Sequence, residues 1–111
     1  MTPDQRAHIR QRIEAMIGEL ATTIGRLESN TKNVSLELTS IGRLSRMDSM
    51  ANLAINDRML SESKARLHKL EYALRRVDGE DYGICEECGE EIPVARLLVM
   101  PEAIVCVSCA S

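Results

Sequence analysis

Aromatic residues are almost absent from this chain of 111 residues, which has no Phe, no Trp and only Tyr72 and Tyr82. A globular core built around several large rings is therefore excluded, and the length suits one domain or two very small ones. No apolar run approaches the roughly 20 residues that a membrane-spanning helix needs. The sequence thus predicts a soluble protein with no membrane partner.

The first 20 residues also lack the uninterrupted apolar stretch of a secretory signal peptide. Charged side chains break this segment at six positions: Asp4, Arg6, Arg10, Arg12, Glu14 and Glu19. Without export, the cysteines of the chain would stay reduced. We therefore expect a cytoplasmic protein without disulfides.

Charge is distributed unevenly along the chain. Residues 1–77 carry thirteen Lys or Arg against nine Asp or Glu, whereas residues 78–111 carry one Arg against eight acids. The second segment therefore has a formal charge of -7 and would repel a phosphate backbone. This balance argues against direct, specific DNA binding by the C-terminal end.

The four cysteines form two C-x-x-C pairs, Cys85/Cys88 and Cys106/Cys109, with seventeen residues between the pairs. This spacing is typical of a tetrahedral zinc site with four thiolate ligands. Such a closed shell leaves no position for water or substrate, so we expect one structural Zn²⁺ and no enzymatic activity. The apolar residues around these cysteines are too few to form a core alone.

A first helix is expected over residues 3–29. Thr2 and Gln5 have the spacing of a capping box, and Pro3 suits the first helical position. Apolar residues then recur at steps of three and four and form a narrow stripe: Ile9, Ile13, Met16, Ile17, Leu20, Ile24 and Leu27.

Residues 30–44 are rich in Asn, Thr, Ser and Lys and are expected to form a loop. A second helix is expected over residues 45–77, with Leu53, Leu60, Leu67 and Leu74 at intervals of seven. Cationic side chains in its last turn and a left-handed Gly79 would end this helix.

Two apolar stripes joined by a short polar loop can bury each other by folding back within one chain. Closing that loop costs less entropy than recruiting a second chain, so we expect a monomer. The predicted fold is mainly α, an antiparallel coiled-coil helical hairpin over residues 1–77 followed by a small four-cysteine zinc-finger module over residues 78–111.

Several segments resemble the DksA/TraR family of bacterial transcription regulators. They are residues 81–93, 95–97, Pro101 and 106–109 around the cysteines, and residues 42–48 at the expected tip of the hairpin. The resemblance implies a coiled-coil hairpin with a zinc finger at its base. It also implies direct binding to RNA polymerase, with the hairpin in the secondary channel of the enzyme and its tip near the active site.

The resemblance also places a polymerase-contact tip at Ser45, Arg46 and Asp48. Asp48 matches the second acidic position of the tip motif, whereas Ser45 stands in place of the first acid. Residues 45–48 also read as a capping box, with Asp48 serving the helix N-terminus. The two roles of Asp48 are compatible.

The resemblance further indicates weak or absent dependence on the alarmone guanosine tetraphosphate. Lys69 is retained, but Met100 and Ala110 replace two basic residues of the family's alarmone site. Separately, cationic side chains on the second helix form either a solvated face or a docking surface for an acidic partner. These candidate docking residues are Arg66, Lys69, Arg75 and Arg76.

Other classes of protein share parts of the pattern. GATA-type DNA-binding fingers have the same seventeen-residue gap, but they continue into a basic tail where this chain has two neutral residues after Cys109. A zinc-stabilised protein-interaction adaptor is a further alternative. A dithiol oxidoreductase or zinc hydrolase is disfavoured because no general base is spaced with the cysteines.

Overall fold

The computed structural model describes residues 1–37 and 43–110, with the side chains of residues 1–32 and 50–110. The described residues form four helices, in chain order α1 (Pro3–Glu37), α2 (Arg43–Arg76), α3 (Val94–Val99) and α4 (Val107–Ala110). The described residues contain no strand, and a single isolated bridge pairs Ile84 with Glu91. The predicted fold class, mainly α with a helical hairpin and a C-terminal four-cysteine module, is confirmed.

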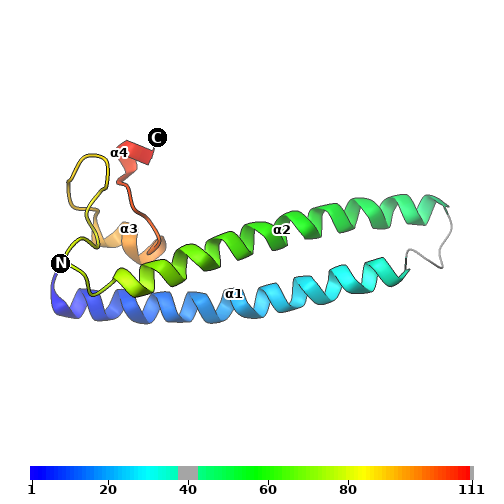
Figure 1. Ribbon diagram of the computed structural model, residues 1–111, viewed down its shortest axis with the longest axis horizontal. Helices are drawn as coiled ribbons and strands as arrows, with labels where there is room; N and C mark the ends of the chain where they lie inside the picture. The colour runs from blue at the N-terminus through cyan, green and yellow to red at the C-terminus, as the bar shows by residue number, and fades with distance from the viewer. Residues whose placement is uncertain (38–42, 111) are drawn as a thin grey trace. The chain divides into compact units, whose positions relative to one another are not determined.

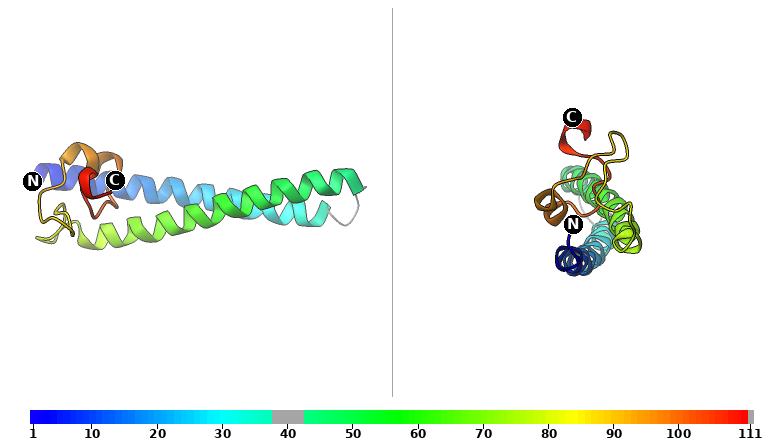
Figure 2. Two further views of the ribbon diagram at one scale, coloured as in Figure 1. Left: turned by 90° about the horizontal axis from the view of Figure 1, so that it is seen from above. Right: turned by 90° about the vertical axis from the view of Figure 1, so that its left-hand side faces the viewer.

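Two compact units divide the chain. One, here called the cysteine unit, contains residues 1–18 and 68–111, and the other, the hairpin unit, contains residues 19–67. Within each unit the segments of α1 and α2 run antiparallel and side by side (Figures 1 and 2). This division differs from the predicted boundary between residues 77 and 78, because one core joins the cysteine module to the neighbouring helix segments.

The core of the cysteine unit explains that difference. The helices contribute Ile9 and Ile13 from α1 and Ala73 and Val77 from α2. These four residues form one buried cluster with members of the cysteine module: Tyr82, Cys85, Ile92 and Leu97. The module has too few apolar residues for a core of its own, so it completes one with residues of the two helices.

In the cysteine unit, polar contacts fix the start of α1 and the end of α2. At the start of α1, Gln5 N–H donates to Thr2 Oγ1 at 3.1 Å and Thr2 N–H donates to Gln5 Oε1 at 2.9 Å, as the capping-box pattern predicts. After α2, the guanidinium of Arg6 donates to the carbonyl oxygens of Val77 and Gly79. These carbonyl groups have no partner within a helix, and Arg6 supplies one.

The left-handed conformation that the sequence suggests for Gly79 is not found. Among the described residues only Gly83 and Gly89 have positive φ angles, of 86° and 75°. Gly79 N–H instead bonds the Arg76 carbonyl oxygen at 2.8 Å. An ion pair between Arg10 and Asp78 also holds this segment against α1. Side-chain capping by arginine thus replaces the glycine cap.

In the hairpin unit, α1 continues to Glu37, eight residues beyond the end predicted at residue 29. The side-chain amide of Asn56 on α2 donates to Leu27 O at 2.9 Å and to Thr31 Oγ1 at 2.7 Å. Lys64 and Glu28 add an ion pair at 3.3 Å. These contacts join α1 to α2 as far as Thr31, two residues beyond the predicted end of the first helix. Helix α2 begins at Arg43, two residues before the predicted start.

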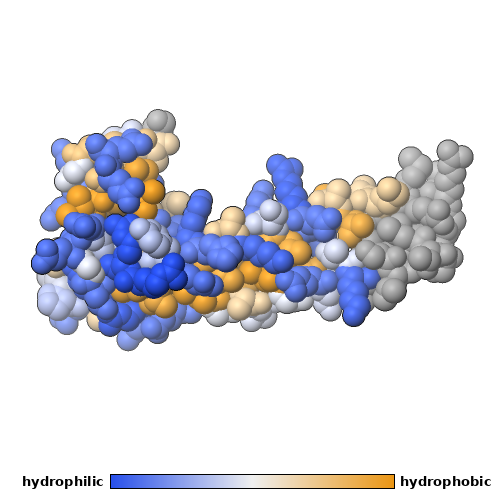
Figure 3. Space-filling model, in the orientation of Figure 1, coloured by the Kyte–Doolittle hydropathy of each residue, from blue (hydrophilic) through white to orange (hydrophobic). Residues whose placement is uncertain are grey.

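The seam of the hairpin unit is thin. Leu53, Leu60 and Leu67 are half-buried, and Leu27 is the one apolar side chain that is fully buried among those described in this unit. Apolar surface follows the paired helices between stretches of hydrophilic surface in Figure 3. The leucines predicted at seven-residue intervals therefore identify the side of α2 that contacts α1, but this side buries little surface area.

No helix in the described part of the chain combines the length and the apolar character that a bilayer span requires.

Candidate metal centre and adjoining groove

The first cysteine pair lies on a tight turn of the chain. Cys85 N–H bonds Glu90 O at 2.8 Å, Gly89 N–H bonds Cys85 O at 2.9 Å, and Ile92 N–H bonds Gly83 O at 2.7 Å. Gly83 and Gly89 adopt the positive φ angles that this path requires and that other residues adopt only with strain. The turn directs both thiols of the pair to one side.

The second pair lies at the start of α4. Cys106 precedes the helix, its carbonyl oxygen accepts a bond from Ala110 N–H at 2.9 Å, and Cys109 follows one turn later. The two pairs are held together by a backbone bond from Glu86 N–H to Ile104 O at 2.9 Å. The segment between the pairs therefore returns the chain to the first turn.

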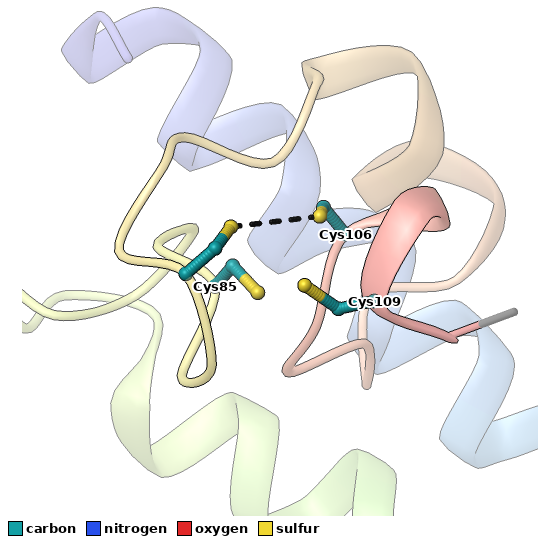
Figure 4. Close-up of side chains that lie close together, drawn as sticks. Cys85, Cys106 and Cys109 are labelled. Carbon is teal, nitrogen blue, oxygen red and sulfur yellow. Dashed lines mark hydrogen bonds between the residues drawn. The ribbon is translucent and has the colours of Figure 1, made fainter.

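All four sulfur atoms lie within 4.8 Å of one another. Figure 4 shows the side chains of Cys85, Cys106 and Cys109 pointing into the space between the two loops. The sulfur atoms of Cys88 and Cys106 are 3.7 Å apart. Thiolates at about 2.3 Å from a zinc ion in a tetrahedron would be about 3.8 Å apart, so the four side chains fit this metal.

Electrostatics within the cluster also favour a cation. Hydrogen bonding to the backbone of Cys88 is the largest cause that lowers the pKa of Cys85 to about 6. Contact with the Cys106 side chain is the largest cause that raises the pKa of Cys109. Four sulfur atoms this close cannot all ionise unless a positive charge offsets their repulsion. A divalent ion supplies that charge.

Burial of the cluster is uneven. Cys85 is buried in the core beside Ile92 and Leu97, whereas Cys88 is exposed and Cys106 and Cys109 are half-buried. The sulfur cluster therefore joins the core of the cysteine unit on one side and approaches solvent on the other. A metal bound here would connect two loops to the helix core, which is a structural role.

A second feature of the cysteine unit is a groove with a volume of about 480 Å³. It is lined by Lys69 and Tyr72 from α2 together with residues of the cysteine module. Lys69, Met100 and Ala110, the three positions that the resemblance singles out, all contribute to its wall. Residues that are distant in the sequence thus share one surface.

All four residues of the predicted docking set lie on α2, with Arg66 in the hairpin unit and Lys69, Arg75 and Arg76 in the cysteine unit. Their role in docking stays a prediction. The guanidinium groups of Arg75 and Arg76 stand 5.8 and 5.2 Å from the ring centroid of Tyr72. Sequence reasoning missed Tyr72, although a lone exposed aromatic residue among cations was the available signal.

The side chains of the predicted tip, Ser45, Arg46 and Asp48, lie outside the described side chains. Their backbone belongs to the first turns of α2. Within the expected tip loop of residues 30–44, helix α1 includes residues 30–37 and α2 begins at Arg43, while residues 38–42 lie outside the described residues.

Together, the paired helices and the four-thiolate cluster define a helical protein with a structural zinc finger. Residues 80–111 match the family model of the prokaryotic dksA/traR C4-type zinc finger. Residues 80–111 therefore form a zinc finger of the dksA/traR type, and the cluster of Cys85, Cys88, Cys106 and Cys109 holds one structural zinc ion.

Individual relatives extend the similarity beyond the finger. The chain is 28% identical over 109 residues to the RNA polymerase-binding transcription factor DksA of Escherichia coli, covering 98% of this chain and 71% of that protein. An uncharacterized protein of Aquifex aeolicus is 39% identical over 64 residues, which are 58% of this chain and 38% of that protein. The solved structure of the transcription factor DksA2 from Pseudomonas aeruginosa superposes with a TM-score of 0.84 at 25% identity, over 99% of this chain and 83% of that chain.

Proposed function

We propose that this protein is a bacterial transcription regulator that binds RNA polymerase directly. The observation that carries the proposal is similarity over 98% of the chain to a factor named for polymerase binding, combined with the same type of zinc finger. The hairpin enters the secondary channel of the polymerase, and its tip acts near the active site to modulate initiation. The protein acts as a monomer in the cytoplasm, where the polymerase is found.

The tip contacts in this proposal are made by Ser45, Arg46 and Asp48. Asp48 supplies one carboxylate, which can approach a metal ion or a basic loop. In vitro transcription with the intact chain and with Asp48→Asn tests this role. Loss of the effect on initiation in Asp48→Asn with retained polymerase binding supports it, and equal activity of both proteins removes Asp48 from the mechanism.

Docking of the cysteine unit and of α2 onto the polymerase surface involves the cations Arg66, Lys69, Arg75 and Arg76. Steering by such charges would make association sensitive to ionic strength. Direct, specific DNA binding forms no part of the proposal, because exposed acids surround the first cysteine turn: Glu86, Glu87, Glu90 and Glu91. A closed thiolate shell likewise supports a role without catalysis.

Dependence on guanosine tetraphosphate is weak or absent in this proposal. The groove that contains Lys69 also contains Arg96, but Glu86 and Glu102 contribute two negative charges to the same wall. Its formal charge is therefore zero, and Met100 and Ala110 add no cation. A polyphosphate needs several cations to offset its charge. Transcription assays with and without the nucleotide should therefore give the same effect of this protein.

A further inference from the structure

The side of α2 that contacts α1 changes character between the two units. Residues 56, 63, 70 and 77 follow one another at intervals of seven on this side. In the cysteine unit the series gives Leu70 and Val77, which are fully buried. In the hairpin unit it gives Asn56 and Ser63, which are polar and half-buried. Apolar burial at these positions is thus absent from the hairpin unit, where polar contacts take its place.

Asn56 makes a polar contact of high specificity with α1. Its side-chain nitrogen donates to Leu27 O at 2.9 Å and to Thr31 Oγ1 at 2.7 Å. A primary amide has two N–H donors, so these two bonds use both of them. The two acceptors belong to residues four positions apart, which lie on one face of a helix. Asn56 therefore binds one particular pair of positions on α1.

A shift of α2 by one heptad along α1 would separate Asn56 from this pair. The residues seven positions before and after Leu27 and Thr31 are all apolar: Leu20, Ile24, Val34 and Leu38. No side-chain oxygen would then replace that of Thr31. An amide that loses a bond in a partly buried position disfavours the shifted arrangement by a factor of about ten. A leucine at position 56 would pack against either set and would not discriminate between them.

The register of the hairpin unit also determines where the first turns of α2 lie. Helix α2 runs without interruption from Arg43 past Asn56, so both ends of this segment move together. A shift of seven residues, at a rise of 1.5 Å per residue, would displace the first turns of α2 by about 10 Å along α1. Residues 45–48, the predicted tip contacts, belong to these turns.

We propose that Asn56 is a positioning residue that selects one register of the hairpin unit and thereby fixes the place of residues 45–48. This selection lowers stability, because a leucine at position 56 would bury more apolar surface. The consequence for transcription rests on the proposed function, whereas the selection of register is a property of the free chain.

Asn56→Leu tests the proposal in the intact, zinc-loaded chain. Ser63→Leu is the matched control, because it places a leucine one heptad later on the same side of α2 and leaves the bonds of Asn56 in place. Both variants should unfold at a temperature at least as high as that of the wild type. If Asn56→Leu aggregates, Asn56→Ala and Ser63→Ala replace the two variants, and their thermal comparison is omitted.

Nuclear magnetic resonance reports the register directly. In the wild type and in the Ser63 variant, the side-chain amide of Asn56 should show nuclear Overhauser effects to Thr31, and every backbone amide should give one signal. In the Asn56 variant, amide signals from the hairpin unit should split or broaden as more than one register is populated. A single set of signals with wild-type contacts between α1 and α2 would overturn the inference, as would split signals in both variants.

In vitro transcription then separates this inference from the proposed function. At concentrations that saturate polymerase binding, Asn56→Leu should change initiation about half as much as the wild type, because two registers of similar population halve the competent fraction. Ser63→Leu should act as the wild type does. Full regulation by a chain with split signals would overturn the role of Asn56 in placing residues 45–48. A wild-type chain that never binds polymerase would overturn the proposed function and leave the selection of register standing.

Discussion

The phenol of Tyr82 donates a hydrogen bond to the carbonyl oxygen of Pro101 at 2.9 Å, and both residues are buried in the cysteine unit. This bond joins the loop that precedes the first cysteine pair to the loop that precedes the second pair. It therefore restrains both arms of the metal centre from a position outside the ligand shell, comparable to the supporting bonds that orient metal ligands elsewhere.

Tyr82→Phe should reduce the free energy of unfolding by about 1–3 kcal/mol, because it leaves the Pro101 carbonyl group buried without its donor. Tyr72→Phe is the matched control, since Tyr72 is 49% exposed and does not belong to the buried cluster of the cysteine unit. Urea unfolding of zinc-loaded protein measures both changes. Equal stability of Tyr82→Phe and wild type would show that the bond contributes nothing.

Burial, followed by the charge of Glu102, raises the pKa of Tyr82 to about 12 against opposing effects of Arg6 and Arg76. The unfolded phenol ionises near its ordinary value of about 10, so the unfolded state releases the proton first as pH rises. The stability that the neutral phenol contributes is thus complete below pH 10 and is lost between pH 10 and about 12. In Tyr72→Phe, tyrosinate absorbance reports Tyr82 alone, because the chain has no Trp and no other Tyr. A titration midpoint of Tyr82 near pH 10 while the protein is still folded would contradict the buried position of its phenol.

Removing zinc should disorganise the cysteine unit beyond its loops, because Cys85 belongs to the same buried cluster as Ile9 and Val77. We expect one zinc per chain, release of that zinc by a chelator, and a fall in helical circular dichroism on release. Cys88→Ser should lose zinc affinity by orders of magnitude, whereas Ser108→Ala, which changes a residue between two ligands, should bind zinc normally. A metal-free chain with unchanged circular dichroism and unfolding would contradict a structural role.

One substitution should have opposite effects at two glycines. Gly25→Ala in α1 should stabilise the protein by about 0.5–1 kcal/mol, because alanine favours helix and the added methyl group meets no atom within 4 Å. Gly89→Ala should destabilise it by about 1–2 kcal/mol, although space is also open there, because φ is 75°. Thermal unfolding of the two variants should shift in opposite directions, and a shared direction would refute the assigned backbone strain.

Some features of this fold can be predicted from local sequence. The capping box of Thr2 and Gln5 and each C-x-x-C pair depend on residues a few positions apart, and each apolar stripe repeats along its own helix. The Arg6 cap could not be predicted, since Arg6 reaches carbonyl groups more than 70 positions later in the chain. The bonds from Asn56 to Leu27 and Thr31 could not be predicted either, because they join residues of two different helices.

In the candidate site, too, features set by local sequence could be predicted and features set by tertiary packing could not. The four ligands were identifiable because their spacing alone defines the chemistry, whereas the groove exists only when α2 and the cysteine module pack together. The family resemblance marked Lys69, Met100 and Ala110 as positions of one alarmone site, and all three line the same groove. The contribution of Tyr72 beside them required the tertiary structure.

The central claim, direct binding to RNA polymerase, is tested most directly by equilibrium binding of the zinc-loaded chain to core enzyme in the absence of DNA. The account predicts a complex at micromolar or lower concentration that a factor occupying the secondary channel displaces. Absence of binding at micromolar concentration, or a steeply salt-dependent affinity for duplex DNA without polymerase, would contradict it.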